Sequence, residues 1–311
     1  MTNPNMPRCP ETGTQTPDED SSPPCVLVFN ANDPSGAGGL NADLLSVASV
    51  GGHALPVATG VYIRDTTRIF DFFPLEEEAV TEQARTILED APAQAIKVGF
   101  AGSPENVSAI AELAADYAEL PLITCMPDLS WWDENRIDSY QDAVRELLLP
   151  QTTVLVGNHN TLCRWLMPDW SPEKDPSARD IARAAAEWGV PYVLVTGIAL
   201  PDQFVDNTLS TAQSVMGSER FERFDAMFMG AGDTLAAALA ALIGAGSDLP
   251  DAVKEALSYL DRCLDAGFRP GMGAVVPDRL FWAEPEDNED DNATETEQTH
   301  LFDPPINETR H

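Results

Sequence analysis

Apolar residues along this chain fall into short continuous runs, separated by longer stretches in which they recur with helical spacing. A run that is apolar at consecutive positions is typical of a strand covered on both faces. We expect such strands at residues 25–31, 54–63, 95–98, 121–125, 153–156 and 192–196. The stretches between them predict helices at about 39–51, 76–90, 104–117, 135–148 and 176–188.

This alternation predicts an α/β fold, in which a mostly parallel sheet lies between two layers of helices. Near the end of the chain, residues 205–215 and 220–224 predict a β-ribbon, followed by helices at about 232–245 and 249–266. No internal repeat is visible, so we expect one domain over residues 25–282. Residues 1–24 and 283–311 are rich in Pro, Ser, Thr, Asn and acidic residues, and we expect both to be disordered acidic tails.

The strongly negative net charge of the chain excludes some classes of binding partner. The chain has 51 acidic and 18 basic residues, a formal net charge of −33. Such a surface repels phosphate backbones and acidic lipids, so we expect no nucleic-acid or membrane partner, and we interpret the acidity as a solubility feature. No apolar run approaches the roughly 18–20 residues that span a bilayer, and no signal-peptide core follows the N-terminus. We therefore expect a cytoplasmic protein.

The cysteines and histidines do not predict a metal centre. Five scattered cysteines without a Cys-x-x-Cys pair argue against a disulfide framework and a zinc site, and favour reduced thiols. Only four histidines are present, two of them in the last twelve residues. We therefore expect no histidine-rich metal centre.

Ligands of open α/β sheets bind beyond the carboxyl ends of the strands, so the strand-to-helix junctions are the candidate sites. The first junction follows the strand at 25–31 and contains Gly36, Gly38 and Gly39. These glycines allow a backbone to approach a ligand closely, in front of a helix whose first N–H groups are free. Asp33 and Asp43 bracket the junction and could hold a hydroxyl group or an ion. A tight turn with capping aspartates explains the same residues equally well.

The second junction, at residues 230–235, opens an alanine-rich helix. Its Gly230, Ala231 and Gly232 are small enough for several N–H donors to converge where charge builds up on a phosphoryl group in transfer. Asp233 follows at the start of the helix, where a general base could take a proton from an attacking alcohol. Capping by Asp233 alone would not explain the glycines. A Walker A sequence is absent, so the pattern does not predict a P-loop enzyme.

Together the two junctions resemble those of the ribokinase-like superfamily, and within it the hydroxymethylpyrimidine/phosphomethylpyrimidine kinases of thiamine biosynthesis. The opening segment of that family, Gly-Ser-Asp-Pro-Ser-Gly-Gly-Ala-Gly-Ile-Gln-Ala-Asp-Leu, is reproduced with few changes. The resemblance spans about residues 25–282 and is carried by segments 31–44, 49–53, 96–100, 193–197, 230–235 and 270–273.

The resemblance implies a ribokinase-like three-layer α/β/α sandwich, ATP with Mg²⁺ as phosphoryl donor, and a pyrimidine alcohol or its phosphate as acceptor. It also implies a possible homodimer, and it leaves the metal ligands unassigned. By the same resemblance the anion hole is formed by the amides of Gly230, Ala231 and Gly232, with Asp233 as catalytic base. The implied acceptor-binding residues are Asp33, Gly38, Asp43, Arg64 and Phe100, and the implied ATP-binding residues are Asn158, Thr196, Gly197 and Thr234.

Four departures from the family pattern bear on function. Arg64 stands where the family usually has Gln, and its guanidinium could bind a phosphate or carboxylate, or simply pair with Asp65 at the surface. Asp233 stands where the family often has Cys, which favours carboxylate base catalysis and leaves a pyridoxal or pyridoxine kinase as an alternative. The acid of an Asn-x-x-Glu segment is replaced by Thr161.

A second acid, in an Asp-Pro motif, is also missing at residues 124–127, with Asp128 as one stand-in. A weakened metal site would slow turnover. The second alternative is therefore a catalytically impaired, pyrimidine-binding regulator. We interpret His159 as structural, and Phe100 and Phe228 as either ring-stacking or core residues.

Overall fold

The computed structural model describes residues 22–171 and 173–283, and the predicted tails fall almost wholly outside these ranges. In the described part, one nine-stranded sheet has the order β3-β2-β1-β4-β5-β6-β7-β8-β9. Strands β2, β1, β4, β5, β6 and β7 run parallel, while β3, β8 and β9 pair antiparallel at the two edges. The strands are β1 (Cys25–Asn32), β2 (His53–Arg64), β3 (Ile69–Pro74), β4 (Ala95–Val98), β5 (Leu122–Cys125), β6 (Val154–Asn158), β7 (Tyr192–Leu200), β8 (Phe204–Ser210) and β9 (Val215–Glu222).

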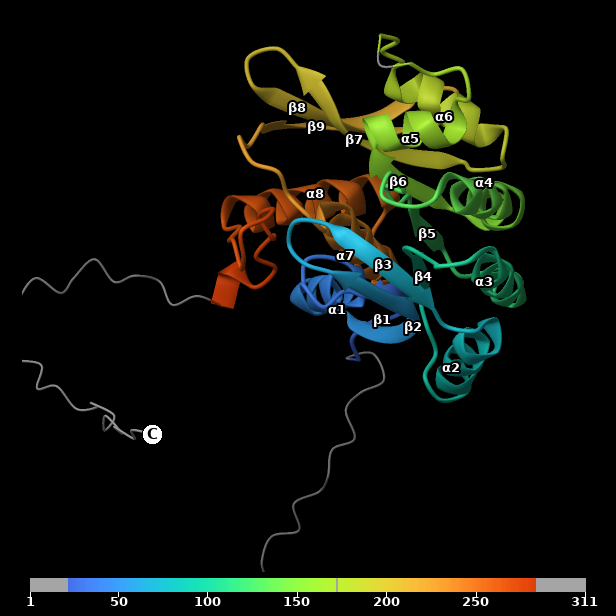
Figure 1. Ribbon diagram of the computed structural model, residues 1–311. Helices are drawn as coiled ribbons and strands as arrows, with labels where there is room; N and C mark the ends of the chain where they lie inside the picture. The colour runs from blue at the N-terminus through green and yellow to red at the C-terminus, as the bar shows by residue number, and fades with distance from the viewer. Residues whose placement is uncertain (1–21, 172, 284–311) are drawn as a thin grey trace, which may run out of the picture. The chain divides into compact units, whose positions relative to one another are not determined.

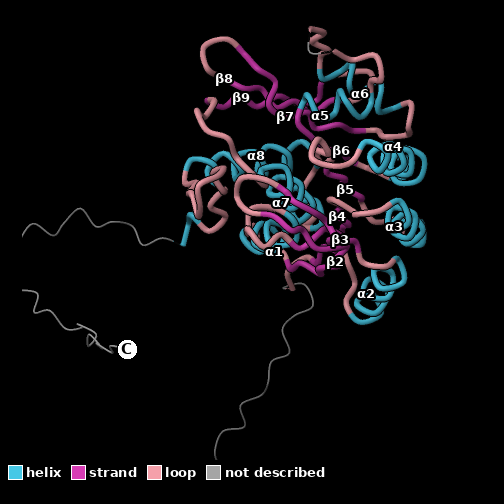
Figure 2. The backbone as a smooth tube through the Cα atoms, viewed as in Figure 1, coloured by secondary structure: helices cyan, strands magenta, loops and turns pink. Residues whose placement is uncertain are grey.

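Helices cover both faces of the sheet, and each face has its own hydrophobic core. Figure 1 shows α2, α3 and α4 along one side of the sheet and α1 and α7 along the other; Figure 2 shows the same layers as a tube. The alternation of side chains explains the division, since Leu27 and Phe29 of β1 belong to the first core, and Val26 and Val28 to the second. The helices are α1 (Gly39–Ser49), α2 (Glu77–Asp90), α3 (Pro104–Asp116), α4 (Glu134–Ala143), α5 (His159–Leu166), α6 (Ala178–Ala186), α7 (Ala231–Gly244) and α8 (Leu249–Asp265).

The predicted three-layer fold is confirmed, with local differences. The predicted β-ribbon is present as the antiparallel strands β8 and β9, but its bounds differ: residues 205–215 were expected as one strand, whereas β8 ends at Ser210, a turn follows, and the second strand begins at Val215 and not at residue 220. The hydroxyl of Thr211 accepts hydrogen bonds from the N–H groups of Gln213 and Ser214, which closes that turn. The predicted helix 135–148 is α4 followed by a π-helical turn, Val144–Leu148, and short 3-10 helices lie at Leu149–Gln151 and Phe281–Ala283. Strand β3 and helix α5 were not predicted.

The order of the strands places a crevice beside β1 and β4. The chain leaves β1 toward β2 on one side and returns to β4 on the other, so loops diverge at the carboxyl ends of these strands, which is where open α/β sheets bind ligands. Val28 of β1 pairs with Lys97 of β4, and Asn30 follows Val28 on the same face. That face is covered by α1 and α7. In the described ranges, no helix is long and apolar enough to cross a membrane.

Candidate active site

A buried lysine lies at the centre of the polar residues on this face. Lys97 is fully buried, and its Nζ donates to Asp43 Oδ1 at 2.7 Å and to Asp233 Oδ1 at 2.8 Å. Asp43 comes from α1 and Asp233 from the first turn of α7, so one β4 residue joins the two predicted glycine junctions. The amide of Asn30 completes the group by donating to Asp43 Oδ2 at 2.8 Å and to Asp233 Oδ1 at 2.9 Å.

Asp233 and Asp43 differ in access to solvent and in pKa. The Asp233 side chain is 22% exposed, whereas the Asp43 side chain is fully buried. Burial raises the pKa of Asp43 to about 7, and the nearby charge of Lys97 only partly offsets this. Burial acts in the same direction on Asp233, but Lys97 and the N–H of Gly39, which donates to Oδ2 at 2.8 Å, hold its pKa below the usual value. At neutral pH Asp233 is therefore an ionised, accessible carboxylate.

The pKa of Lys97 shifts in the direction that keeps it charged. Burial would lower this pKa, but the carboxylates of Asp233 and Asp43 raise it above its ordinary value. A buried charge is tolerated when it is paired and hydrogen-bonded, as it is here. The lysine therefore stays protonated and fixes Asp233 at the mouth of the site.

The two glycine loops touch through their backbones. A Cβ atom at Gly38 would lie 3.2 Å from Asp233 Oδ2 and 3.7 Å from the Cα of Gly230. Gly230 has φ +83°, and a Cβ there would lie 1.6 Å from the carbonyl oxygen of Ala37. Only glycine combines that conformation with that approach. The junctions that the sequence singled out thus form one structure.

Helix α7 begins with donors that no side chain caps. Gly230 is the N-cap residue and makes no side-chain cap hydrogen bond, so Ala231, Gly232 and Asp233 form the first turn. Asp233 is therefore not the N-cap. The first N–H groups of a helix have no intrahelical acceptor, and the helix dipole adds positive potential there. This end of α7 is suited to bind the oxygens of a phosphoryl group.

A cavity of about 400 Å³ opens above this helix end. One wall is formed by Asp233, Gly230, Ala231 and Gly232, and most of the other lining residues lie at or just beyond the carboxyl ends of β1, β4, β5 and β6. The lining also contains Cys125, which lies beside Gly232: a Cβ built on Gly232 would lie 3.3 Å from the Sγ of Cys125. The remaining lining residues are Asn30, Tyr62, Gly99, Phe100, Met126, Pro127, Asp128, Val156, Gly157, Asn158, Thr161, Thr196 and Phe228.

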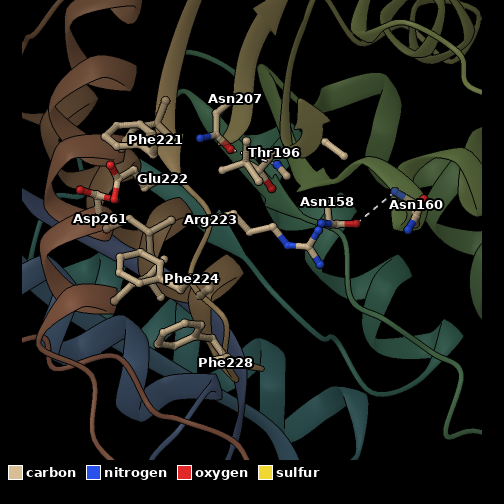
Figure 3. A pocket seen from close by; sticks show the side chains of 18 residues that line it. Asn158, Asn160, Thr196, Asn207, Phe221, Glu222, Arg223, Phe224, Phe228 and Asp261 are labelled. Atoms are coloured by element: carbon tan, nitrogen blue, oxygen red, sulfur yellow. Dashed lines mark hydrogen bonds between the residues drawn. The ribbon is translucent and has the colours of Figure 1, made fainter. Parts of the chain in front are cut away.

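A second cavity, of about 460 Å³, adjoins the first. The two share Asn158, Thr196, Phe228 and Ala231. Figure 3 shows the rings of Phe221, Phe224 and Phe228 on one side of this second cavity and the side chain of Arg223 extending toward Asn158. The aromatic walls suit a ligand that has a flat ring, and Arg223 is the cation that could bind an anionic part of it. The carboxylates of Glu222 and Asp261 also line this cavity.

The predicted ATP-binding residues lie mainly around this second cavity. Asn158, Thr196 and Gly197 line it. Asn158 caps α5 by accepting from the N–H of Asn160 at 3.0 Å (Figure 3). Thr234 is not among the lining residues; it is buried beneath the helix end, and its hydroxyl donates to the Gly230 carbonyl at 2.8 Å.

Among the predicted acceptor-binding residues, Asp33, Gly38 and Arg64 form a group of their own next to Asp233. Asp33 Oδ2 accepts from the N–H of Gly38 at 3.0 Å and from Arg64 Nη1 at 3.2 Å. The Arg64 side chain is only 9% exposed, so the alternative of a surface pair with the Asp65 carboxylate is wrong. The Asp65 carboxylate instead closes its own turn with Thr67 and Arg68.

Neither Asp43 nor Phe100 is placed for direct contact with a ligand. Asp43 does not line the cavity and reaches Asp233 only through Lys97 and Asn30. Phe100 lines the cavity, but the residue is only 3% exposed. It packs within 6 Å of the rings of Tyr62, Phe72, Trp131, Trp132 and Tyr140. The aromatic cluster thus supports the wall of the cavity from behind.

Sequence reasoning missed Lys97, Asn30 and Arg279 as site residues. A signal existed for Lys97: it stands in a four-residue strand that is otherwise apolar, where a buried charge requires partners. Arg279 is 2% exposed and binds both glycine loops, but no local motif marks it. His159 contacts the carbonyl of Pro176 at 2.8 Å and lines neither cavity, as expected of a structural residue.

Comparisons with known proteins agree on the family. The sequence model described as phosphomethylpyrimidine kinase matches residues 33–278. The chain is 31% identical over 263 residues to the hydroxymethylpyrimidine/phosphomethylpyrimidine kinase of Streptomyces coelicolor, covering 84% of this chain and 96% of that protein. It is 28% identical over 251 residues to the Escherichia coli K12 protein of the same description, covering 77% and 90% of the two chains.

Solved structures share the fold. The pyridoxal kinase from Staphylococcus aureus, in complex with AMP-PCP and pyridoxal, superimposes with a TM-score of 0.73 at 20% identity over 84% of this chain and 95% of that one. The phosphomethylpyrimidine kinase from Clostridium difficile gives a TM-score of 0.62 at 20% identity over 76% and 97%. The fold and the relatives define a small-molecule kinase, a phosphotransferase of ribokinase-like architecture. Within that class the chain belongs to the phosphomethylpyrimidine kinase family.

Proposed function

We propose that this protein transfers the γ-phosphoryl group of ATP to hydroxymethylpyrimidine, to its monophosphate, or to both, in thiamine biosynthesis or salvage. One observation carries the proposal: Asp233 and the uncapped end of α7 lie where two cavities meet. The cavity walled by aromatic residues suits the nucleotide, and the cavity at Asp233 suits the acceptor. The names of the relatives supply the pyrimidine.

With an alcohol as acceptor, Asp233 acts as general base. The acceptor oxygen forms a bond to the γ-phosphorus while the bond from that phosphorus to the ADP oxygen breaks. The alcohol proton passes to the Asp233 carboxylate, which its lowered pKa keeps ionised at neutral pH. The N–H groups of Ala231 and Gly232 stabilise the charge that develops on the phosphoryl oxygens.

With the monophosphate as acceptor, no base is required. A phosphate ester loses its second proton near pH 6, so its attacking oxygen is already ionised at pH 7.5. We therefore expect Asp233→Asn to lower kcat for the alcohol by about 100-fold, the usual scale of general-base catalysis, and to lower kcat for the monophosphate far less. Equal losses with both acceptors would contradict the role of Asp233 as a base.

The site offers few oxygen ligands for Mg²⁺, in keeping with a cation that is held largely by nucleotide phosphates and water. Besides Asp233, the lining of the cavity that includes Asn158 and Thr161 has one other carboxylate, that of Asp128. Three or more potential metal ligands of the His, Cys, Asp and Glu type do not gather anywhere in residues 22–171 and 173–283. Asp128 and the Asn158 amide would hold the ion, which would supply charge neutralisation to the phosphates.

An acceptor screen tests the proposal. Purified protein with ATP and Mg²⁺ is offered pyrimidine alcohols, their monophosphates, B6 vitamers and sugars, and ADP release is measured. We expect turnover with the pyrimidines. Turnover confined to B6 vitamers would favour a pyridoxal kinase instead. Thermal stabilisation by a pyrimidine without turnover at any Mg²⁺ concentration would favour a regulator.

We also propose a cytoplasmic location, a homodimer and a single kinase domain over residues 25–282. The homodimer rests on the family resemblance alone. Sedimentation equilibrium of the purified chain tests it, and a single species of 33.6 kDa at all concentrations would contradict it.

A further inference from the structure

Arg279 is a buried cation that backbone oxygens hold in place of a carboxylate. Its residue exposure is 2%, and among the residues that the structure describes no Asp or Glu forms an ion pair with its guanidinium. Burying an unpaired charge costs several kcal/mol. We therefore expect the hydrogen bonds of this arginine, or the positive potential of its charge, to offset that cost.

The guanidinium binds both glycine loops at once. Nε donates to Thr234 Oγ1 at 2.9 Å, in the first turn of α7. Nη1 donates to the carbonyl of Gly36 at 3.3 Å, and Nη2 donates to the carbonyl of Ala37, both in the first loop. Since the Thr234 hydroxyl in turn donates a hydrogen bond to the Gly230 carbonyl, the chain of hydrogen bonds runs from one loop to the other.

The backbone of Arg279 is fixed as well. Its carbonyl oxygen accepts from the Ser49 hydroxyl at 2.7 Å and from the Tyr259 hydroxyl at 3.0 Å. These two residues lie in α1 and α8, the helices on either side of α7. Both the main chain and the guanidinium of Arg279 are thus held by hydrogen bonds, and packing of α1 and α8 against α7 sets where the guanidinium lies relative to α7.

The charge lies directly behind the anion hole. A Cβ on Gly230 would come within 2.8 Å of Arg279 Nη2, which places the guanidinium against the turn that presents the N–H groups of α7. A positive charge here adds to the potential of the helix end and is shielded from water by the loops. The cavity side of the same turn is where the phosphoryl group would pass.

We propose that Arg279 is a positioning residue that locks the two glycine loops together and supplies positive charge from beneath the phosphoryl-binding turn. This inference rests on the proposed kinase function. It assigns Arg279 no contact with substrate. Its effect therefore falls on kcat, through the geometry and potential of the N–H groups, rather than on acceptor affinity.

Three substitutions separate the charge from the hydrogen bonds. Arg279→Gln keeps a donor but removes the charge, Arg279→Lys keeps the charge with fewer donors, and Arg279→Met removes both. Loss of one anion-hole donor typically lowers kcat about 100-fold, and we expect a loss of that order for Arg279→Gln with both KM values within about threefold. We expect the kcat of Arg279→Lys to be at least tenfold higher than that of Arg279→Gln.

Arg145→Met is the matched control. Arg145 also donates from Nε and Nη2 to a carbonyl, that of Trp165, but lies in the opposite helical layer. Its loss should lower Tm without lowering kcat. If Arg279→Gln has normal kcat, or if Arg279→Lys and Arg279→Gln lose activity equally and in proportion to Tm, the inference is overturned.

Hydrogen exchange separates this inference from the proposed function. Arg279→Gln should speed amide exchange at residues 36–39 and at 230–233 together, whether or not any acceptor is turned over. Unchanged exchange at either loop would overturn the coupling. Normal coupling in a protein that phosphorylates no acceptor would instead contradict the kinase proposal alone.

Discussion

At the residue scale, the site depends on one lysine that two carboxylates share. Lys97 holds the pKa of Asp233 below its usual value of 3.8 although burial acts to raise it. A group whose pKa is lowered by folding stabilises the protein above its unfolded pKa, and this stabilisation is lost as pH falls. Activity and stability should therefore both depend on Lys97. With Lys97 present, Asp233 stabilises the fold as pH rises, whereas a buried Asp233 without this partner would destabilise it as pH rises.

We predict that Lys97→Met moves the acid limb of the pH–kcat profile upward by a unit or more. Without the ammonium, burial raises the pKa of Asp233, so the base becomes protonated at a higher pH. The folded variant would then hold protons that its unfolded chain releases above about pH 4, so its stability should fall as pH rises. Profiles of kcat from pH 4.5 to 8 and urea unfolding at two pH values measure both effects.

Asp43→Asn is the control for this prediction. It removes the carboxyl whose pKa is about 7 but leaves the pair of Lys97 and Asp233 intact. Its acid limb should stay at or below that of the unmodified protein. A Lys97→Met profile that superimposes on the unmodified one would show that the lysine does not set the state of the base.

Arg64 should determine the preference for a charged acceptor. Its guanidinium lies in the loop group beside Asp233 and has one ion-pair partner, Asp33 at 3.2 Å. A hydrogen bond to a charged group contributes about 1.5–3 kcal/mol, or roughly 10- to 100-fold. We predict that Arg64→Gln raises KM for the pyrimidine monophosphate by this factor and leaves KM for the alcohol within threefold.

Arg68→Gln is the matched control for Arg64→Gln. Arg68 belongs to the same β2–β3 hairpin, but its guanidinium lies over the exposed ring of Phe70. It should leave both KM values unchanged. An equal rise in KM for alcohol and monophosphate in Arg64→Gln would assign Arg64 to the shape of the pocket and not to recognition of charge.

Sequence patterns revealed the residues of this site that stand in a local motif. Asp233 and the glycines were predictable, because a β-α junction built of small residues has few other uses. For Lys97 the sequence offered one signal, a charge inside an apolar strand, but its partner Asp233 lies 136 positions away and could not be identified. Arg279 had no local signal, because it binds a loop more than 200 positions away along the chain. Arg64 was recognised as a departure, but only the fold shows that it turns inward to Asp33.

At the element scale, the entry to α7 is the most constrained backbone of the site. We predict that Gly230→Ala lowers kcat by at least 100-fold and destabilises the protein by more than the 1–2 kcal/mol that a left-handed residue costs on its own. The excess arises because the new Cβ would lie 1.6 Å from the Ala37 carbonyl and push the loops apart. Steady-state kinetics and urea unfolding measure the two losses.

Gly246→Ala, just beyond the other end of α7, is a close control. Gly246 also has positive φ, +90°, but a Cβ there meets nothing within 4 Å. It should cost about 1–2 kcal/mol and leave kcat unchanged. If both glycine variants retain activity, contact between the two loops is not required for transfer.

Elements with strong and uniform patterns were predicted well. Strand β4 was placed at Ala95–Val98, and the helix that is α7 was placed within one residue at each end, because an unbroken run of Ala and Leu has no competing interpretation. Strand β3 was missed because it pairs only at an edge and two of its three phenylalanines, Phe70 and Phe73, are exposed. It forms by pairing with β2, and this pairing leaves no pattern in the sequence of β3 itself.

At the scale of the whole molecule, the formal charge of −33 opposes compaction. In the described part, the ion pairs that could offset this are few, and two of them gather on Lys97 at the site. Most acidic groups therefore repel one another across solvent. Repulsion of this kind is screened by salt over the Debye length.

We predict that Tm rises with NaCl, with most of the rise below about 0.3 M. The Debye length falls from roughly 30 Å at 0.01 M to 10 Å at 0.1 M, so repulsion between surface carboxylates is largely removed in this range, whereas the buried pairs of Lys97 are screened much less. Differential scanning calorimetry across the series measures the shift. Sucrose at matched osmolality is the control, since it leaves Coulomb repulsion unscreened. A flat or falling Tm would mean that the surface charge is already balanced in the folded protein.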